Sequence, residues 1–157
     1  MSLFENSQYQ YRETFFVLFA REKRPTASQF TDALADLGNR YEVENLIASD
    51  DGLFESLTLL APYDNSAMDI TYVEGEDVTV QVEELNEKLR NATLTGMDIK
   101  KLARLGSCDA RFEIYHFEQV IDDDDEGLDP GSLLIVQESL AKLTDGIGVD
   151  PQAETLM

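Results

Sequence analysis

The sequence is poor in two residue types that often bind metals or act as nucleophiles, because it contains one cysteine, Cys108, and one histidine, His116. A single cysteine excludes an internal disulfide and a zinc site of several thiolates, and a single histidine excludes a two-histidine zinc site within the chain. His116 lies in an apolar run, so we expect it to be a half-buried packing residue. A Cys108–His116 nucleophile pair would need contact between residues eight positions apart along a loop and a strand, which we do not expect.

The common catalytic and nucleotide-binding motifs are also missing. The sequence contains no GxGxxG after a strand, no GxxxxGK[ST], no GxSxG and no HExxH. Dinucleotide-binding, P-loop, serine-hydrolase and zincin chemistry therefore lack their sequence marks. Nothing singles out two carboxylates among the 32 Asp and Glu residues. We predict no catalytic residue and no cofactor, and keep open an enzyme of unmarked type that uses Asp or Glu with Tyr or His116.

Basic residues are few, since 12 Lys and Arg stand against 32 Asp and Glu and give a formal net charge of -20. Such a surface repels phosphate backbones and anionic lipids, so we predict no nucleic-acid and no membrane partner. It favours a basic protein partner or divalent cations, or it serves solubility in a saline setting. The N-terminus lacks the marks of a signal peptide and no apolar run approaches roughly 20 residues, so we expect a cytoplasmic location.

The most apolar stretch is RETFFVLFA, residues 12–20. Five consecutive apolar residues, too short a run for a helix and rich in aromatic side chains, predict a central strand that is buried on both faces. A helix over 26–37 follows, with Thr26 or Ser28 as its cap and Gly38 as its stop. Two strands over 41–48 and 53–61 flank the turn Ser49-Asp50-Asp51-Gly52, which is typical of a hairpin.

The second half of the chain alternates between helical and extended patterns. Residues 68–74 give a weak strand signal, and 76–89 and 98–105 predict amphipathic helices. A strand over 110–120, a helix carrying the apolar residues 133–143 and a short strand over 147–149 complete the order. We expect one domain over 1–157, with loosely ordered ends at 1–11 and 153–157.

Without the weaker strands, the order is β-α-β-β-α-β followed by a C-terminal helix. This order predicts an α+β fold, specifically a ferredoxin-like sandwich with one or two short added strands. A different α+β sheet of five or six mixed strands is the main alternative.

An acidic loop is predicted over 121–131. Asp122, Asp124 and Glu126 occupy positions 1, 3 and 5 of an EF-hand pattern and Gly127 its sixth, but position 12 is Leu133, where a carboxylate is needed. These three acids are therefore weak metal candidates. We predict a solvated loop and name its acids as candidate partner-binding residues: Asp122, Asp123, Asp124, Asp125 and Glu126.

Three functions remain open from the sequence. The first is a non-catalytic domain that acts by protein–protein interaction, including self-association into a homo-oligomer, through a sheet face or edge. The second is an acidic inhibitor or immunity-type protein that masks a basic partner, which requires the acids to cluster on one face. The third is the unmarked carboxylate enzyme named above.

Overall fold

The computed structural model describes residues 9–38, 41–62, 65–90, 96–119, 131–150 and 155–156. The strands are β1 (Tyr9–Phe19), β2 (Glu42–Ala48), β3 (Phe54–Ala61), β4 (Ser66–Glu74), β5 (Ala110–Gln119), β6 (Ile147–Asp150) and β7 (Thr155–Leu156). The helices are α1 (Ala27–Ala35), α2 (Glu76–Arg90), α3 (Gly96–Leu105) and α4 (Gly131–Thr144), with a short 3-10 turn over Arg21–Lys23. No helix of these described segments is long and apolar enough to cross a membrane.

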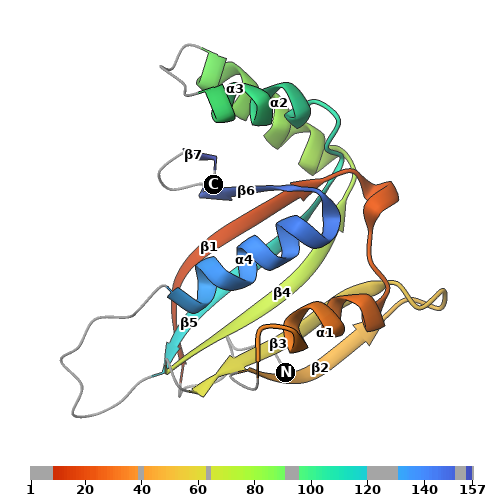
Figure 1. Ribbon diagram of the computed structural model, residues 1–157, viewed down its shortest axis with the longest axis vertical. Helices are drawn as coiled ribbons and strands as arrows, with labels where there is room; N and C mark the ends of the chain where they lie inside the picture. Colours follow the sequence, from red (N-terminus) through yellow and green to blue (C-terminus); the bar gives the residue numbers. More distant parts are fainter. Residues whose placement is uncertain are drawn as a thin grey trace.

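The strands form one seven-stranded sheet in the order β2-β3-β4-β5-β1-β6-β7. All neighbouring strands are antiparallel. Helices α1 and α4 lie over one face, here called the first face, and α2 and α3 form a separate pair at one end of the sheet (Figure 1). The predicted α+β class is therefore confirmed.

The ferredoxin-like order is not confirmed. The stretch with the weak strand signal is the nine-residue strand β4, which lies inside the sheet between β3 and β5. Its signal is weak because only Met68, Ile70 and Tyr72 contact the core on the first face, whereas Asp69 and Thr71 point to the opposite, second face. Once β4 is counted, β2, β3 and β4 form a meander and the six-element order no longer describes the chain.

Strand β1 confirms the prediction of burial on both faces. Phe15, Val17 and Phe19 belong to the large core cluster on the first face, together with Phe30 of α1 and Leu140 of α4. Leu18, one residue out of phase, packs on the second face against residues of α2 and α3, including Val82 and Leu105. The alternation of a strand places these neighbouring side chains in two separate clusters.

The first helix begins as predicted. The Thr26 side chain accepts a hydrogen bond from the Gln29 backbone N–H at 3.1 Å, and the Gln29 side chain accepts one from the Thr26 backbone N–H at 3.0 Å. This reciprocal capping box fixes the start of α1. Pro25 and Ala27 also bond to the backbone of Phe54 and Gly52, so the helix start is tied to the beginning of β3.

Candidate interaction edge

Among the described strands, β2 forms one edge of the sheet and pairs with β3 alone. All seven of its residues are exposed, including the aliphatic side chains Val43, Leu46 and Ile47 at 40%, 44% and 52%. A strand with one face on a core normally buries every second side chain. β2 buries none, so it presents both its unpaired backbone edge and its apolar side chains to solvent.

The sequence of β2 explains why it departs from regular alternation. Glu42, Val43 and Glu44 pair in register with β3, but the register then shifts between Glu44 and Ile47 and again before Ala48. Asn45 has a φ of 54°, in the left-handed region that Asn tolerates better than most residues. The irregularity lets the adjacent residues Leu46 and Ile47 both be exposed.

A hollow of about 400 Å³ lies beside the C-terminal end of β2. Its lining residues come from β2, β3, β4 and the turn before α1: Arg24, Ile47, Glu55, Ser56, Thr71, Tyr72 and Glu74. The Arg24 guanidinium lies 4.0 Å from the centre of the Tyr72 ring and donates two hydrogen bonds, of 3.1 and 2.8 Å, to the Phe54 carbonyl. Arg24 is the only cation among the described residues of this lining, and it is already held by three contacts.

The edge is strongly acidic. Glu42 and Glu44 on β2, Asp50 and Asp51 in the following turn, and Glu55 at the start of β3 are all exposed. Burial raises the pKa of Tyr9, and the negative charges of Glu44 and Glu42 raise that pKa further, so these carboxylates act on neighbouring groups. The edge therefore favours a positively charged ligand and repels a negatively charged one.

The second face carries a polar row that continues inward from β2. The Thr58 hydroxyl donates to Asp69 at 2.7 Å, and Arg111 forms an ion pair with Glu113 at 2.8 Å. Tyr115 donates a short hydrogen bond to Glu113. Burial, and then this hydrogen bond, raise the pKa of Tyr115 to about 12, so its hydroxyl stays protonated and serves as a donor. These described groups form hydrogen bonds or ion pairs with one another, so none of those named in this row is left as a free base for catalysis.

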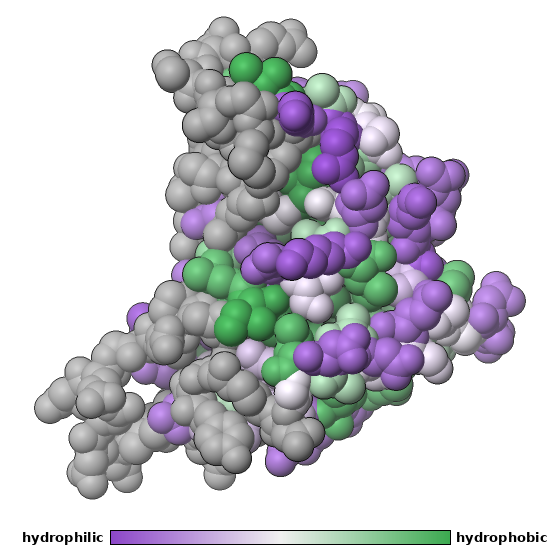
Figure 2. All heavy atoms as spheres, in the orientation of Figure 1, coloured by the Kyte–Doolittle hydropathy of each residue, from purple (hydrophilic) through white to green (hydrophobic). Residues whose placement is uncertain are grey.

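A second hollow, of about 520 Å³, runs along α4 and β6. Figure 2 shows hydrophobic side chains over the face that carries α1 and α4, crossed by hydrophilic ones. The polar side chains beside this hollow are engaged: Gln137 donates to the Phe16 carbonyl at 3.0 Å, Lys142 pairs with Glu138 at 3.1 Å, and Asp145 pairs with Arg104. Each of these described side chains therefore bonds to another group of the protein and is not directed at a ligand.

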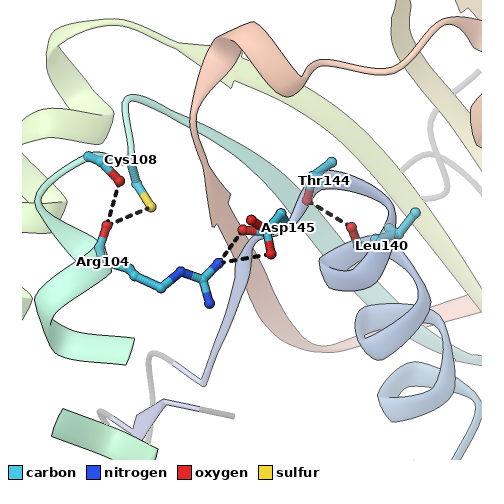
Figure 3. Close-up of polar contacts among 6 residues, drawn as sticks. Arg104, Cys108, Leu140, Thr144 and Asp145 are labelled. Atoms are coloured by element: carbon cyan, nitrogen blue, oxygen red, sulfur yellow. Dashed lines mark hydrogen bonds and ion pairs between the residues drawn. The ribbon is translucent and has the colours of Figure 1, made fainter. Parts of the chain in front are cut away.

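Cys108 lies at the end of α3, where Arg104 reaches across to Asp145 in the turn between α4 and β6 (Figure 3). Its sulfur lies 3.8 Å from the Arg104 carbonyl. Burial raises the pKa of Cys108 to about 11, which keeps the sulfur as a thiol and makes it a poor nucleophile. Cys108 packs in the second-face cluster with Leu18 and Leu105.

His116 lies far from Cys108. It is six residues beyond Ala110 along β5, a separation of roughly 20 Å at the rise of an extended strand. Its side chain is completely buried, so the expectation of half burial underestimated its enclosure. The structure therefore keeps these two residues apart. This agrees with the expectation from the sequence that they do not form a nucleophile pair.

The predicted acidic loop, with Asp122, Asp123, Asp124, Asp125 and Glu126, lies outside the described residues. Among the residues that the structure does describe, no group of three or more His, Cys, Asp or Glu side chains is arranged to hold a metal ion.

The sequence does not show that β2 is an exposed edge, although its exposed residues lie within a correctly predicted strand. The only signal was an irregular one, the run Asn45-Leu46-Ile47, which breaks the polar–apolar alternation.

Comparisons with known proteins give no further guide to the site. No protein-family model matches the sequence, and neither the curated proteins nor the solved structures yield a significant match.

Proposed function

We propose that this chain is a non-catalytic protein-interaction domain that binds a basic, extended segment of another protein along the edge strand β2. The observation that carries this proposal is that all seven residues of β2 are exposed, including its three large aliphatic side chains. An added strand gains main-chain hydrogen bonds from the unpaired edge, and its side chains can contact Val43 on one face of the sheet and Ile47 on the other, with Leu46 between them.

Charge supports a basic partner over self-pairing of β2. Two copies joined along this edge would bring the Glu42 and Glu44 carboxylates of both chains close together, which is destabilising for directly opposed like charges. Each copy also carries a formal net charge of -20, which opposes their encounter. A lysine- or arginine-bearing segment meets neither obstacle, so it is the occupant that the edge favours.

Charge alone does not define this site. Exposed carboxylates also lie on α1, at Asp32 and Asp36, and on α2, at Glu83, Glu84 and Glu87. The described acids therefore occupy the first face, the second face and the edge, whereas the inhibitor hypothesis requires them on one face. Exposed aliphatic side chains also occur on the helices, such as Val80 on α2, but β2 combines three of them with the edge of a sheet, and this combination distinguishes it from the other acidic surfaces.

The test uses a synthetic probe, an eight-residue peptide of alternating Lys and Val, with fluorescence anisotropy as the readout. We expect saturable binding that weakens as salt rises. A peptide of the same sequence that is N-methylated at every residue keeps the charge but loses all of its main-chain donors, so it should bind at least about tenfold more weakly. Equal binding of the two peptides would contradict strand addition.

A matched pair of variants locates the binding site. The double substitution Glu42→Lys/Glu44→Lys reverses two charges on β2, and Glu84→Lys/Glu87→Lys makes the same change of charge on α2. All four positions are exposed, so both variants should fold. We expect the β2 variant to lose at least about tenfold in affinity and the α2 variant much less. Equal losses would show that the peptide responds only to net charge, and a concentration-dependent dimer in light scattering would support self-association instead.

A further inference from the structure

The one histidine of the sequence lies in an unusual environment on the first face. The side chain of His116 is completely buried, and neither Nδ1 nor Nε2 has a hydrogen-bond partner among the described residues. Across the ladder it faces Met68 on β4 and Glu13 on β1. Its Nδ1 lies 3.5 Å from a carboxylate oxygen of Glu13. A buried imidazole without hydrogen bonds is costly, and its cost depends on its protonation state.

A bulge in β1 determines which residue faces the imidazole. Tyr11 pairs with Phe117, so a regular ladder would place Arg12 opposite His116. The register instead shifts between Tyr11 and Glu13, and Glu13 takes the position opposite His116. Arg12 turns to Glu118, 3.5 Å away. The extra residue thus replaces a cation with a carboxylate beside the ring, which is the re-aiming of a side chain that bulges commonly provide.

The charges around the imidazole come from β1 and from its own strand β5. Burial lowers the pKa of His116, the negative charge of Glu13 opposes this, Arg12 lowers the pKa further, and Glu118 raises it, with a net lowering. Strand β4 contributes the uncharged Met68 at this position. Helix α4 also covers the first face, and its charged residues Glu138 and Lys142 form an ion pair with each other.

We propose that Glu13 and His116 form a pH-responsive lock between β1 and β5, closed while the imidazole is neutral and loosened when it takes a proton. An imidazolium in this position needs more solvation than one partly exposed carboxylate at 3.5 Å supplies. Separation of β1 from β5 at the bulge admits water to the ring. The lock and the binding edge use different residues, because β3, β4 and β5 separate β1 from β2 in the sheet order.

The direction of the pH effect follows from proton linkage. Because the pKa of His116 is lowered in the closed state, the open state binds more protons when pH falls below the ordinary value of 6.5. The equilibrium constant for opening then rises by up to about tenfold for each pH unit until the closed-state pKa is reached. Above pH 6.5 this contribution to closure is complete.

Two measurements on the full chain test the lock. A single histidine gives one imidazole resonance, so an NMR titration reads its pKa without a variant, and we expect a value below 6.5 that falls further in Glu13→Gln. Hydrogen exchange, divided by the intrinsic exchange rate at each pH, should show a larger opening constant at pH 5.5 than at pH 7.5 for amides of residues 11–14 and 115–117. Amides of residues 57–59, on β3, should change less.

Two variants separate the lock from a general effect of acid. His116→Phe keeps an aromatic ring without a titrating group, and it should abolish the pH-dependent difference between the two groups of amides. Glu138→Gln, which removes an exposed carboxylate of α4 that pairs with Lys142, should leave the difference in place. An imidazole pKa at or above 6.5, uniform exchange over the sheet, or an unchanged difference in His116→Phe would overturn the proposal.

Discussion

The centre of the sheet and its β2 edge use the same types of apolar residue with opposite results. At the centre, Phe15, Val17 and Phe19 on β1 are enclosed by α1 and α4, and Leu18 is enclosed on the other face by α2 and α3. At the edge, Val43, Leu46 and Ile47 are exposed. Apolar residues therefore favour a strand in both regions. Whether the side chains of that strand stabilise the fold or remain available for binding depends on whether helices cover them.

The largest effect should come from the aromatic cluster of the core. The ring of Phe112 is fully buried, and its centre lies 4.7 Å from that of Phe19, 5.3 Å from Phe30 and 5.7 Å from Phe54. Phe112→Ala removes the shared partner of these rings, and we expect it to lower the free energy of unfolding by about 3–5 kcal/mol. Urea denaturation measures the loss, and Phe112→Leu should lose clearly less. Equal losses would mean that the ring contacts do not matter.

A glycine where the sheet meets α4 should give the next largest effect. A Cβ at Gly146 would lie 2.7 Å from the Leu18 carbonyl oxygen and 3.1 Å from the Phe19 Cβ. Gly146→Ala must therefore displace the backbone of β1 or of the turn, at a cost of about 1–3 kcal/mol. The matched control is Gly106→Ala, where an added Cβ meets no atom within 4 Å. Similar melting temperatures for the two variants would contradict the close approach.

The cap of α1 should give a smaller loss. Thr26→Ala removes the side-chain oxygen that accepts the Gln29 N–H, and we expect a cost of about 1 kcal/mol. Thr26→Ser keeps the acceptor and should recover most of the stability. Thermal unfolding followed by circular dichroism compares the three proteins. A loss in the serine variant as large as in the alanine variant would assign the effect to the methyl group instead.

Sequence reasoning succeeded where local pattern and tertiary position agree. The apolar run of β1, the capping residues of α1 and the hairpin turn with Gly52 at a φ of 81° were all predictable from neighbouring residues. The strand order was not, because the pairing of β5 with both β4 and β1 joins segments distant in the chain. Likewise, no local pattern in the sequence shows that Arg12 is the extra residue of a bulge or that Glu13 faces His116.

The smallest effect on stability should come from the edge, and it sharpens the comparison most. Ile47 is 52% exposed, so Ile47→Thr, which keeps a β-branched side chain, should change the free energy of unfolding by no more than about 0.5 kcal/mol. The same substitution should weaken binding of the Lys-Val peptide several-fold, because it removes apolar contact area at the proposed site. An exposed aliphatic on α4 supplies the control, since Ile135→Thr changes similar surface away from β2. A loss of stability in Ile47→Thr as large as that of a core substitution would show that Ile47 belongs to the fold and not to an interface. Equal peptide binding by Ile47→Thr and Ile135→Thr would show that apolar contact at β2 does not contribute to binding.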